Sequence, residues 1–296
     1  MEQRKENIVM FPFMAQGHII PFLALALELE QKVYTITFVN TPLNIKKLRS
    51  SLSSTSTIRL HEIPFNSSDH GLPPRCQNTD VLPHHLITHF LTICPSLEPS
   101  FRKLLSDLIQ ENGGVKPLCV IGDFFFGWSA GVAHEFGVFH AIFSGRGGFG
   151  LACYYSTWLN LPHKKTDSSE FTLPDFPEAG KIHRTQLTPS YLSASDTDPS
   201  TLFQWKNLPV WSNSDGFLFN TWKAELELLK YQEFLLMEKI ELVMSENERG
   251  HEIRTKACEV QEMIKDSIRD EEEFKGSSVK AMDEFFKAVL LMKENN

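Results

Sequence analysis

One histidine lies where a short apolar run gives way to an amphipathic helix, a position suited to proton transfer. Residues 7–11 (NIVMF) predict a buried strand, and residues 15–29 (AQGHIIPFLALALEL) predict a turn and a helix with His18 at its start. Open α/β sheets bind ligands at the carboxyl ends of their parallel strands, which is where this side chain would lie. Because an imidazole titrates near neutral pH, His18 could take a proton from a hydroxyl group. The residues alone also allow a purely structural or merely exposed histidine.

A histidine that acts as a base needs a partner to fix its tautomer and stabilise the imidazolium, and carboxylates commonly do this. Asp123 ends a second predicted strand, within residues 119–126 (CVIGDFFF). If the two strands are neighbours in a parallel sheet, both side chains emerge at the same edge. The alternative is that Asp123 only caps the helix that follows.

Other chemical motifs are weaker. His84, His85 and His89 include an i, i+4 pair that could bind a metal on a helix, but no third ligand is near, so we predict no metal site. The chain has no GxxxxGK[ST] phosphate loop and no GxSxG nucleophile elbow. The aromatic run at 124–126 and Trp128 predict core packing, with a few rings available to line an apolar pocket.

Glycines at positions 145, 147, 148 and 150 predict a flexible turn that can approach a ligand closely. They do not form a strand–turn–helix GxGxxG followed about 20 residues later by an acidic residue, so no dinucleotide site is predicted.

Alternating strand and helix signals predict one parallel sheet. Further strands are expected at 33–39, 57–63, 118–121, 138–143 and 216–220, and helices at 19–31, 96–111 and 127–136. A helix between consecutive strands requires parallel pairing. Loop is expected at 64–83, a long surface excursion at 162–200, and charged helices at 223–246 and 251–269. A last helix is expected to start at Gly276–Ser278, with Ser277 or Ser278 as its cap. Its expected apolar stripe consists of Val279, Met282, Phe286 and Val289.

Composition excludes several classes of protein. The 296 residues are sufficient for one large domain or two smaller ones, and the net charge of −8 argues against nucleic acid or anionic membrane as partners. The charged amino terminus does not resemble a signal peptide, and no apolar run approaches the ~20 residues of a membrane span. Five scattered cysteines without CxxC spacing indicate a reduced setting. We therefore expect a cytoplasmic protein and a monomer.

Three ordered motifs resemble the amino-terminal half of plant family-1 UDP-glycosyltransferases: AQGHIIPFLALALEL at 15–29, CVIGDFFFGWSAGVAHEFGVFHAIF at 119–143 and GFLFNT at 216–221. Residues 237–268 and 274–290 are similar to the carboxyl terminus of that family. The resemblance implies the GT-B architecture of two facing Rossmann-like domains. Residues 1–222 would form the acceptor-binding domain. Residues 223–296 would be a helical remnant of the UDP-sugar domain, whose last helix docks back on the first domain.

The resemblance also implies a reaction. His18 would be the general base for a hydroxyl of a small lipophilic acceptor, such as a plant secondary metabolite, and Asp123 its orienting carboxylate. The acceptor oxygen would attack the anomeric carbon and expel UDP with inversion, without a metal or cofactor and with UDP-sugar as co-substrate. Gly17, Ser144 and Gly145 would lie near the acceptor or donor, Ser144 where many relatives place a hydroxyl residue.

One departure from the family is large. The stretch that opens with Trp-Ala-Pro-Gln, continues through His-Cys-Gly-Trp-Asn-Ser and binds the nucleotide sugar is missing, as if a block between Thr221 and Met237 had been deleted. Binding of UDP-sugar is therefore doubtful, and we expect impaired transfer. A non-catalytic module that only binds acceptor is the alternative, and a homologous chain that supplies the missing half is a third possibility.

Overall fold

The computed structural model describes residues 6–32, 34–220, 255, 266–267, 269–271 and 274–294. The chain divides into two compact units, one comprising Met1–Asn220 with Met292–Asn296 and the other Thr221–Leu291. The helices expected at 223–246 and 251–269 lie almost entirely outside the described residues. The roles assigned to residues 1–222 and 223–296 stay predictions.

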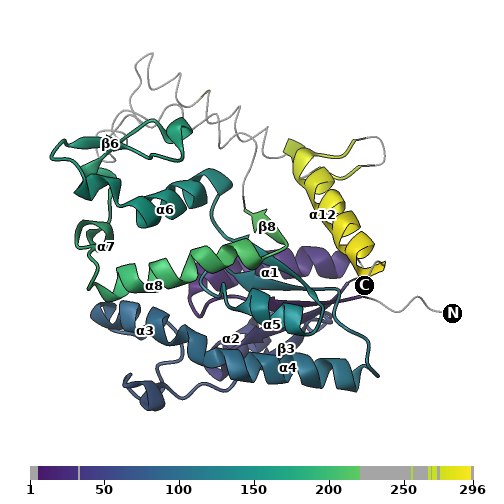
Figure 1. The fold of residues 1–296 in the computed structure, drawn as a ribbon. Helices are drawn as coiled ribbons and strands as arrows, with labels where there is room; N and C mark the ends of the chain where they lie inside the picture. Colours follow the sequence, from purple (N-terminus) through teal and green to yellow (C-terminus); the bar gives the residue numbers. More distant parts are fainter. Residues whose placement is uncertain are drawn as a thin grey trace. The chain divides into compact units, whose positions relative to one another are not determined.

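A parallel sheet organises the first unit, as the alternating signals predicted (Figure 1). Within the described residues its six strands run in the order β3-β2-β1-β4-β5-β8. They are β1 (Asn7–Phe11), β2 (Thr35–Asn40), β3 (Arg59–Glu62), β4 (Cys119–Asp123), β5 (Phe139–Ser144) and β8 (Gly216–Phe219). Two short strands, β6 (Glu170–Thr172) and β7 (Lys181–His183), pair antiparallel within the expected surface excursion.

The helices of the described chain are mostly short. They are α1 (Gln16–Gln31), α2 (Pro42–Ser51), α3 (Ile87–Ile93), α4 (Glu98–Glu111), α5 (Ser129–Glu135), α6 (Gly148–Asn160), α7 (Pro189–Leu192), α8 (Pro199–Asn207) and α12 (Ser277–Glu294). None of them combines the length and apolar character that crossing a bilayer requires.

Helices cover both faces of the sheet, so its central strands are buried on both sides (Figure 1). One face carries Val9 and Val120, which pack in a cluster with apolar residues of α4 and α5. On the other face Phe143 of β5 meets Phe22 of α1, with ring centroids 4.8 Å apart. This packing fixes the position of α1, whose first turn carries His18.

Three expectations about elements need correction. The first helix begins at Gln16 rather than residue 19, so His18 lies inside it. The helix α2 was not expected, although Pro42 occupies a first-turn position that suits proline. The prediction of a turn at 145–150 is wrong for its second half, because Gly148 and Gly150 lie in α6. Their helix is stabilised by tertiary packing of Leu151 and Trp158, which overrides the poor helix propensity of glycine.

The last helix, α12, begins at Ser277, within the expected residues, so Gly276 rather than a serine precedes its first residue. Val279, Phe286 and Val289 of its predicted apolar stripe are buried. Its docking on the first domain stays a prediction.

Candidate active site

The adjacency of two strands brings His18 and Asp123 together. Strands β1 and β4 are neighbours, with Phe11 opposite Gly122, and Asp123 is the last residue of β4. Residues 12–15 lead from the end of β1 into α1, so both side chains lie at the carboxyl edge of the sheet. The Nδ1 atom of His18 lies 2.8 Å from Oδ2 of Asp123.

Backbone amides hold the Asp123 carboxylate in place. The Phe13 N–H donates to Oδ2 at 3.1 Å, and the Phe125 N–H donates to Oδ1 at 3.0 Å. The side chain is only 1% exposed, so these donors replace the water that a carboxylate would otherwise bind. The capping alternative for Asp123 is wrong, because α5 begins six residues later with Trp128 at its N-cap position.

Aromatic rings surround the imidazole of His18. Phe124 and Phe125 stack on it with ring centroids 5.3 and 5.2 Å away, and Phe13 meets it edge-on at 5.2 Å. The side chain is 18% exposed. A carboxylate can only accept, so Nδ1 carries the proton that bonds to Asp123. Nε2 has no hydrogen-bond partner among the described residues and is the nitrogen available to accept a proton.

The other predicted site residues differ in their surroundings. Gly17 has open space where a side chain would begin. At Gly145 a Cβ atom would lie 2.7 Å from Cγ of Pro21, so this glycine allows close packing against α1. Ser144 is buried, and its Oγ accepts a hydrogen bond from the Arg146 N–H at 3.1 Å. For Gly17, Ser144 and Gly145, a position beside the acceptor or the donor stays a prediction.

The histidines at 84, 85 and 89 lie in two successive short helices. His85 lies in a 3-10 helix, while His89 lies in α3 and bonds through Nε2 to the carbonyl of His70 at 2.7 Å. The i, i+4 pair is therefore not on one continuous α-helix. No group of three or more potential metal ligands occurs in the part of the chain that the structure describes.

The cluster of aromatic rings that includes Phe124 is larger than the sequence indicated. Phe124 also contacts Tyr154 and Trp211, and Tyr154 contacts Tyr191. Burial raises the pKa of Tyr154 well above its ordinary value, so its hydroxyl stays neutral. Of these rings, the sequence signalled only the run at 124–126. The others come from helices distant in the chain, and no spacing pattern connects them.

Comparison with known proteins identifies the family. Residues 5–139 match the family described as "Glycosyltransferase, N-terminal domain". The chain is 52% identical over 225 residues to UDP-glycosyltransferase 92A1 of Arabidopsis thaliana. The matched region covers 74% of this chain and 46% of that protein. The chain belongs to the plant family-1 UDP-glycosyltransferases.

Other family members show the same pattern of coverage. Crocetin glucosyltransferase 3 of Crocus sativus is 44% identical over 219 residues, covering 73% of this chain and 46% of that protein. The crystal structure of UGT73P12 of Glycyrrhiza uralensis, solved with glycyrrhetinic acid 3-O-monoglucuronide, superposes with a TM-score of 0.56 at 22% identity. It covers 77% of this chain and 47% of that chain, and it shows the shared Rossmann-like fold. The chain spans about half the length of the curated relatives it matches.

Proposed function

We propose that this chain provides the acceptor-binding and proton-accepting half of a UDP-sugar-dependent glycosyl transfer. The observation that carries the proposal is the hydrogen bond between Nδ1 of His18 and Oδ2 of Asp123, 2.8 Å apart, with Nε2 of the imidazole left without a partner among the described residues.

In the proposed reaction an acceptor hydroxyl lies at Nε2 of His18. Its proton passes to Nε2, and the resulting imidazolium is stabilised by the Asp123 carboxylate. The oxygen forms a bond to the anomeric carbon of the sugar as the bond from that carbon to UDP breaks, so the configuration inverts. UDP-sugar is the co-substrate, and the proposed chemistry uses neither a metal nor a cofactor.

The rings around His18 favour a lipophilic acceptor. Phe13, Phe124 and Phe125 make the surroundings of the base apolar, with Phe13 and Phe124 buried and Phe125 partly buried. Aromatic rings gain additional energy from stacked or edge-to-face contact. The Crocus sativus relative is named for crocetin, and we propose a small plant metabolite of comparable apolar character here.

We propose that the chain by itself transfers sugar poorly. Binding energy from the nucleotide, distant from the reacting carbon, normally positions the sugar for attack. The nucleotide-sugar signature is missing from the sequence, and the chain spans about half the length of its relatives. The second candidate function follows from the same observations: a module that binds acceptor without catalysis.

We further propose a cytoplasmic monomer. Cys76, Cys94 and Cys119 are buried and unpaired, and Cys153 is half-buried and unpaired, as expected for a reducing compartment. Cys258 lies outside the described residues.

The test combines binding and turnover. The purified chain is incubated with UDP-glucose and a panel of phenols and flavonoids, beside His18→Ala and the exposed control His85→Ala. We expect an acceptor to bind, and any transfer to fall by about 10²- to 10⁴-fold in His18→Ala alone. Turnover that survives His18→Ala would overturn the proposed base. Robust turnover by the chain alone would overturn the proposed impairment. Transfer that appears only on mixing with a homologous chain would identify the missing half as a partner.

A further inference from the structure

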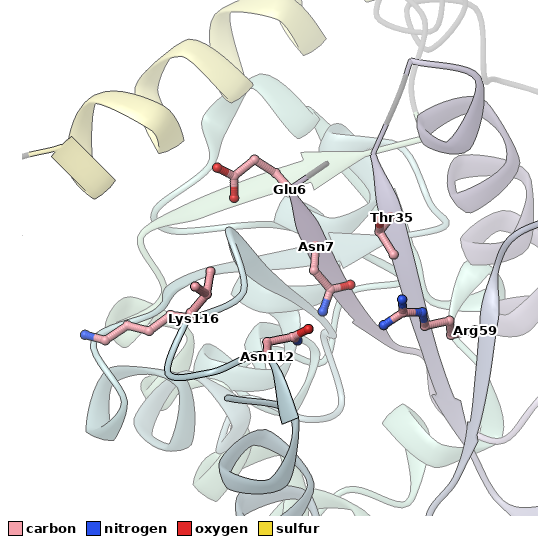
Figure 2. Close-up of a pocket in the computed structure, with 7 residues that line it drawn as sticks. Glu6, Asn7, Thr35, Arg59, Asn112 and Lys116 are labelled. Atoms are coloured by element: carbon pink, nitrogen blue, oxygen red, sulfur yellow. The ribbon is translucent and has the colours of Figure 1, made fainter. Parts of the chain in front are cut away.

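A polar hollow lies at the amino edge of the sheet, opposite the edge that carries His18 (Figure 2). Asn7, Thr35 and Arg59 are the first residues of β1, β2 and β3, and each lines it. The loop after α4 and the residue before β1 complete its lining with Asn112, Val115, Lys116 and Glu6. The cavity measures about 240 Å³, which is large enough for a small ion or metabolite.

The side-chain amide of Asn7 is held with its donor unused. The buried Thr37 hydroxyl donates to Oδ1 of Asn7 at 3.1 Å. The Nδ2 atom on the other side is buried and has no hydrogen-bond partner within the part of the chain that the structure describes. Buried donors without partners are rare in folded proteins because they lose their bond to water. This donor is therefore prepared for a ligand acceptor.

Arg59 supplies the positive charge of the hollow. Its position follows from the sheet register, in which it lies opposite Thr37. The guanidinium extends toward Asn7, and no ion pair of Arg59 occurs among the described residues (Figure 2). The neighbouring Arg49 differs, because it pairs with Glu62 at 3.7 Å.

The other two charged residues contribute little at the centre. Figure 2 shows the Glu6 carboxylate and the Lys116 ammonium pointing away from the Arg59 guanidinium. The Nζ atom of Lys116 instead lies beside Gly137, 2.8 Å from the place a Cβ would occupy. Arg59 and Asn7 thus line the hollow together, and the Glu6 carboxylate that also belongs to its lining points away from the guanidinium.

We propose that this hollow binds a small oxyanion, a phosphate or a carboxylate, through the Arg59 guanidinium and the Asn7 side-chain amide. A planar guanidinium presents paired N–H groups that match two oxygens of either anion. The carboxyl end of α4 also borders the hollow, and its partial negative charge limits the affinity. We therefore expect binding on the order of millimolar. The site is separate from the proposed acceptor site.

The experiment is a titration of the full chain with inorganic phosphate, followed by NMR of the Asn7 side-chain amide, with sodium chloride at matched ionic strength as the blank. We expect a saturable shift of the Asn7 amide signal. Arg59→Gln should weaken binding by at least about tenfold, because a charge-assisted hydrogen bond is lost. Arg49→Gln is the matched control and should leave the affinity unchanged.

A second variant tests the amide donor. Asn7→Asp keeps an acceptor for the Thr37 hydroxyl but replaces the donor by a negative charge that can pair with Arg59. We expect phosphate binding to be lost while the protein stays folded. A parallel titration with acetate distinguishes a carboxylate from a phosphate ligand.

Absence of a saturable shift with both anions, or equal binding by wild type and Arg59→Gln, would overturn the proposal. Neither result bears on His18, whose acceptor binding is measured separately at the opposite edge of the sheet.

Discussion

At the scale of single residues, the Asp123 carboxylate accepts hydrogen bonds from an imidazole and from two backbone amides. Asp123→Ala would leave buried donors without partners. We expect the free energy of unfolding to fall by about 2–4 kcal/mol, measured by urea denaturation. The control is Asp107→Ala, which removes an exposed i, i+4 pair with Lys103 and should cost less than about 0.5 kcal/mol. Equal losses in the two variants would contradict the role given to the buried amides.

His140 makes stability depend on pH. It is fully buried between the hydroxyls of Ser129 and Ser214, at 2.8 and 3.0 Å. Burial, reinforced by the nearby His134 and opposed by Asp215, lowers the pKa of His140 from 6.5 to about 3. Between about pH 6.5 and about pH 3, this histidine is protonated in the unfolded chain but neutral in the folded chain. The free energy of unfolding therefore falls as the pH drops from 6.5 towards 3.

The measurement compares wild type with His140→Gln. Between pH 7 and pH 5 the wild type should lose about 2 kcal/mol more unfolding free energy than the variant, which has no titrating group at this position. The exposed His85→Gln should keep the wild-type pH dependence. A parallel decline in wild type and His140→Gln would contradict the assignment.

At the scale of elements, close packing of Gly145 against Pro21 positions α1 and hence His18. In Gly145→Ala the new Cβ would lie 2.7 Å from Cγ of Pro21. Because α1 must shift, we expect a loss of about 1–3 kcal/mol in unfolding free energy. We also expect changed NMR shifts for the His18 ring.

The matched control lies in the next helix. A Cβ at Gly150 of α6 would meet nothing within 4 Å. Gly150→Ala should therefore stabilise the chain by about 0.5–1 kcal/mol, because alanine has the higher helix propensity. Destabilisation by Gly150→Ala, or none by Gly145→Ala, would show that the packing argument is wrong.

The sequence predicted elements best where periodicity was strong. In α4 the apolar residues Phe101, Leu104, Leu105 and Leu108 follow one helical face, and all four are buried. The sequence predicted α6 poorly, because its glycines favour a turn locally. The contacts that stabilise this helix are made with residues far along the chain. Contacts of that kind leave no periodic signal.

At the scale of the whole molecule, the proposed acceptor and UDP-glucose should affect stability differently. A phenolic acceptor that binds the native chain should raise its Tm by mass action, whereas UDP-glucose should not, because the donor signature is missing. At 100 times its Kd the acceptor should add about 2.7 kcal/mol to the unfolding free energy. Differential scanning fluorimetry with each compound alone provides the measurement. A shift with UDP-glucose comparable to that with acceptor would contradict the proposed loss of the donor site.

The sequence by itself determined the parallel α/β class, the family, and the two residues that the proposed chemistry needs. These follow from local patterns, namely apolar runs, helical periodicity and short motifs with fixed spacing. Only the tertiary structure decided that β1 and β4 are neighbours, that the Phe13 amide holds Asp123, and that Asn7 and Arg59 meet at the opposite edge. Each of these depends on strand order and register, which are set by packing between segments as far as 110 residues apart.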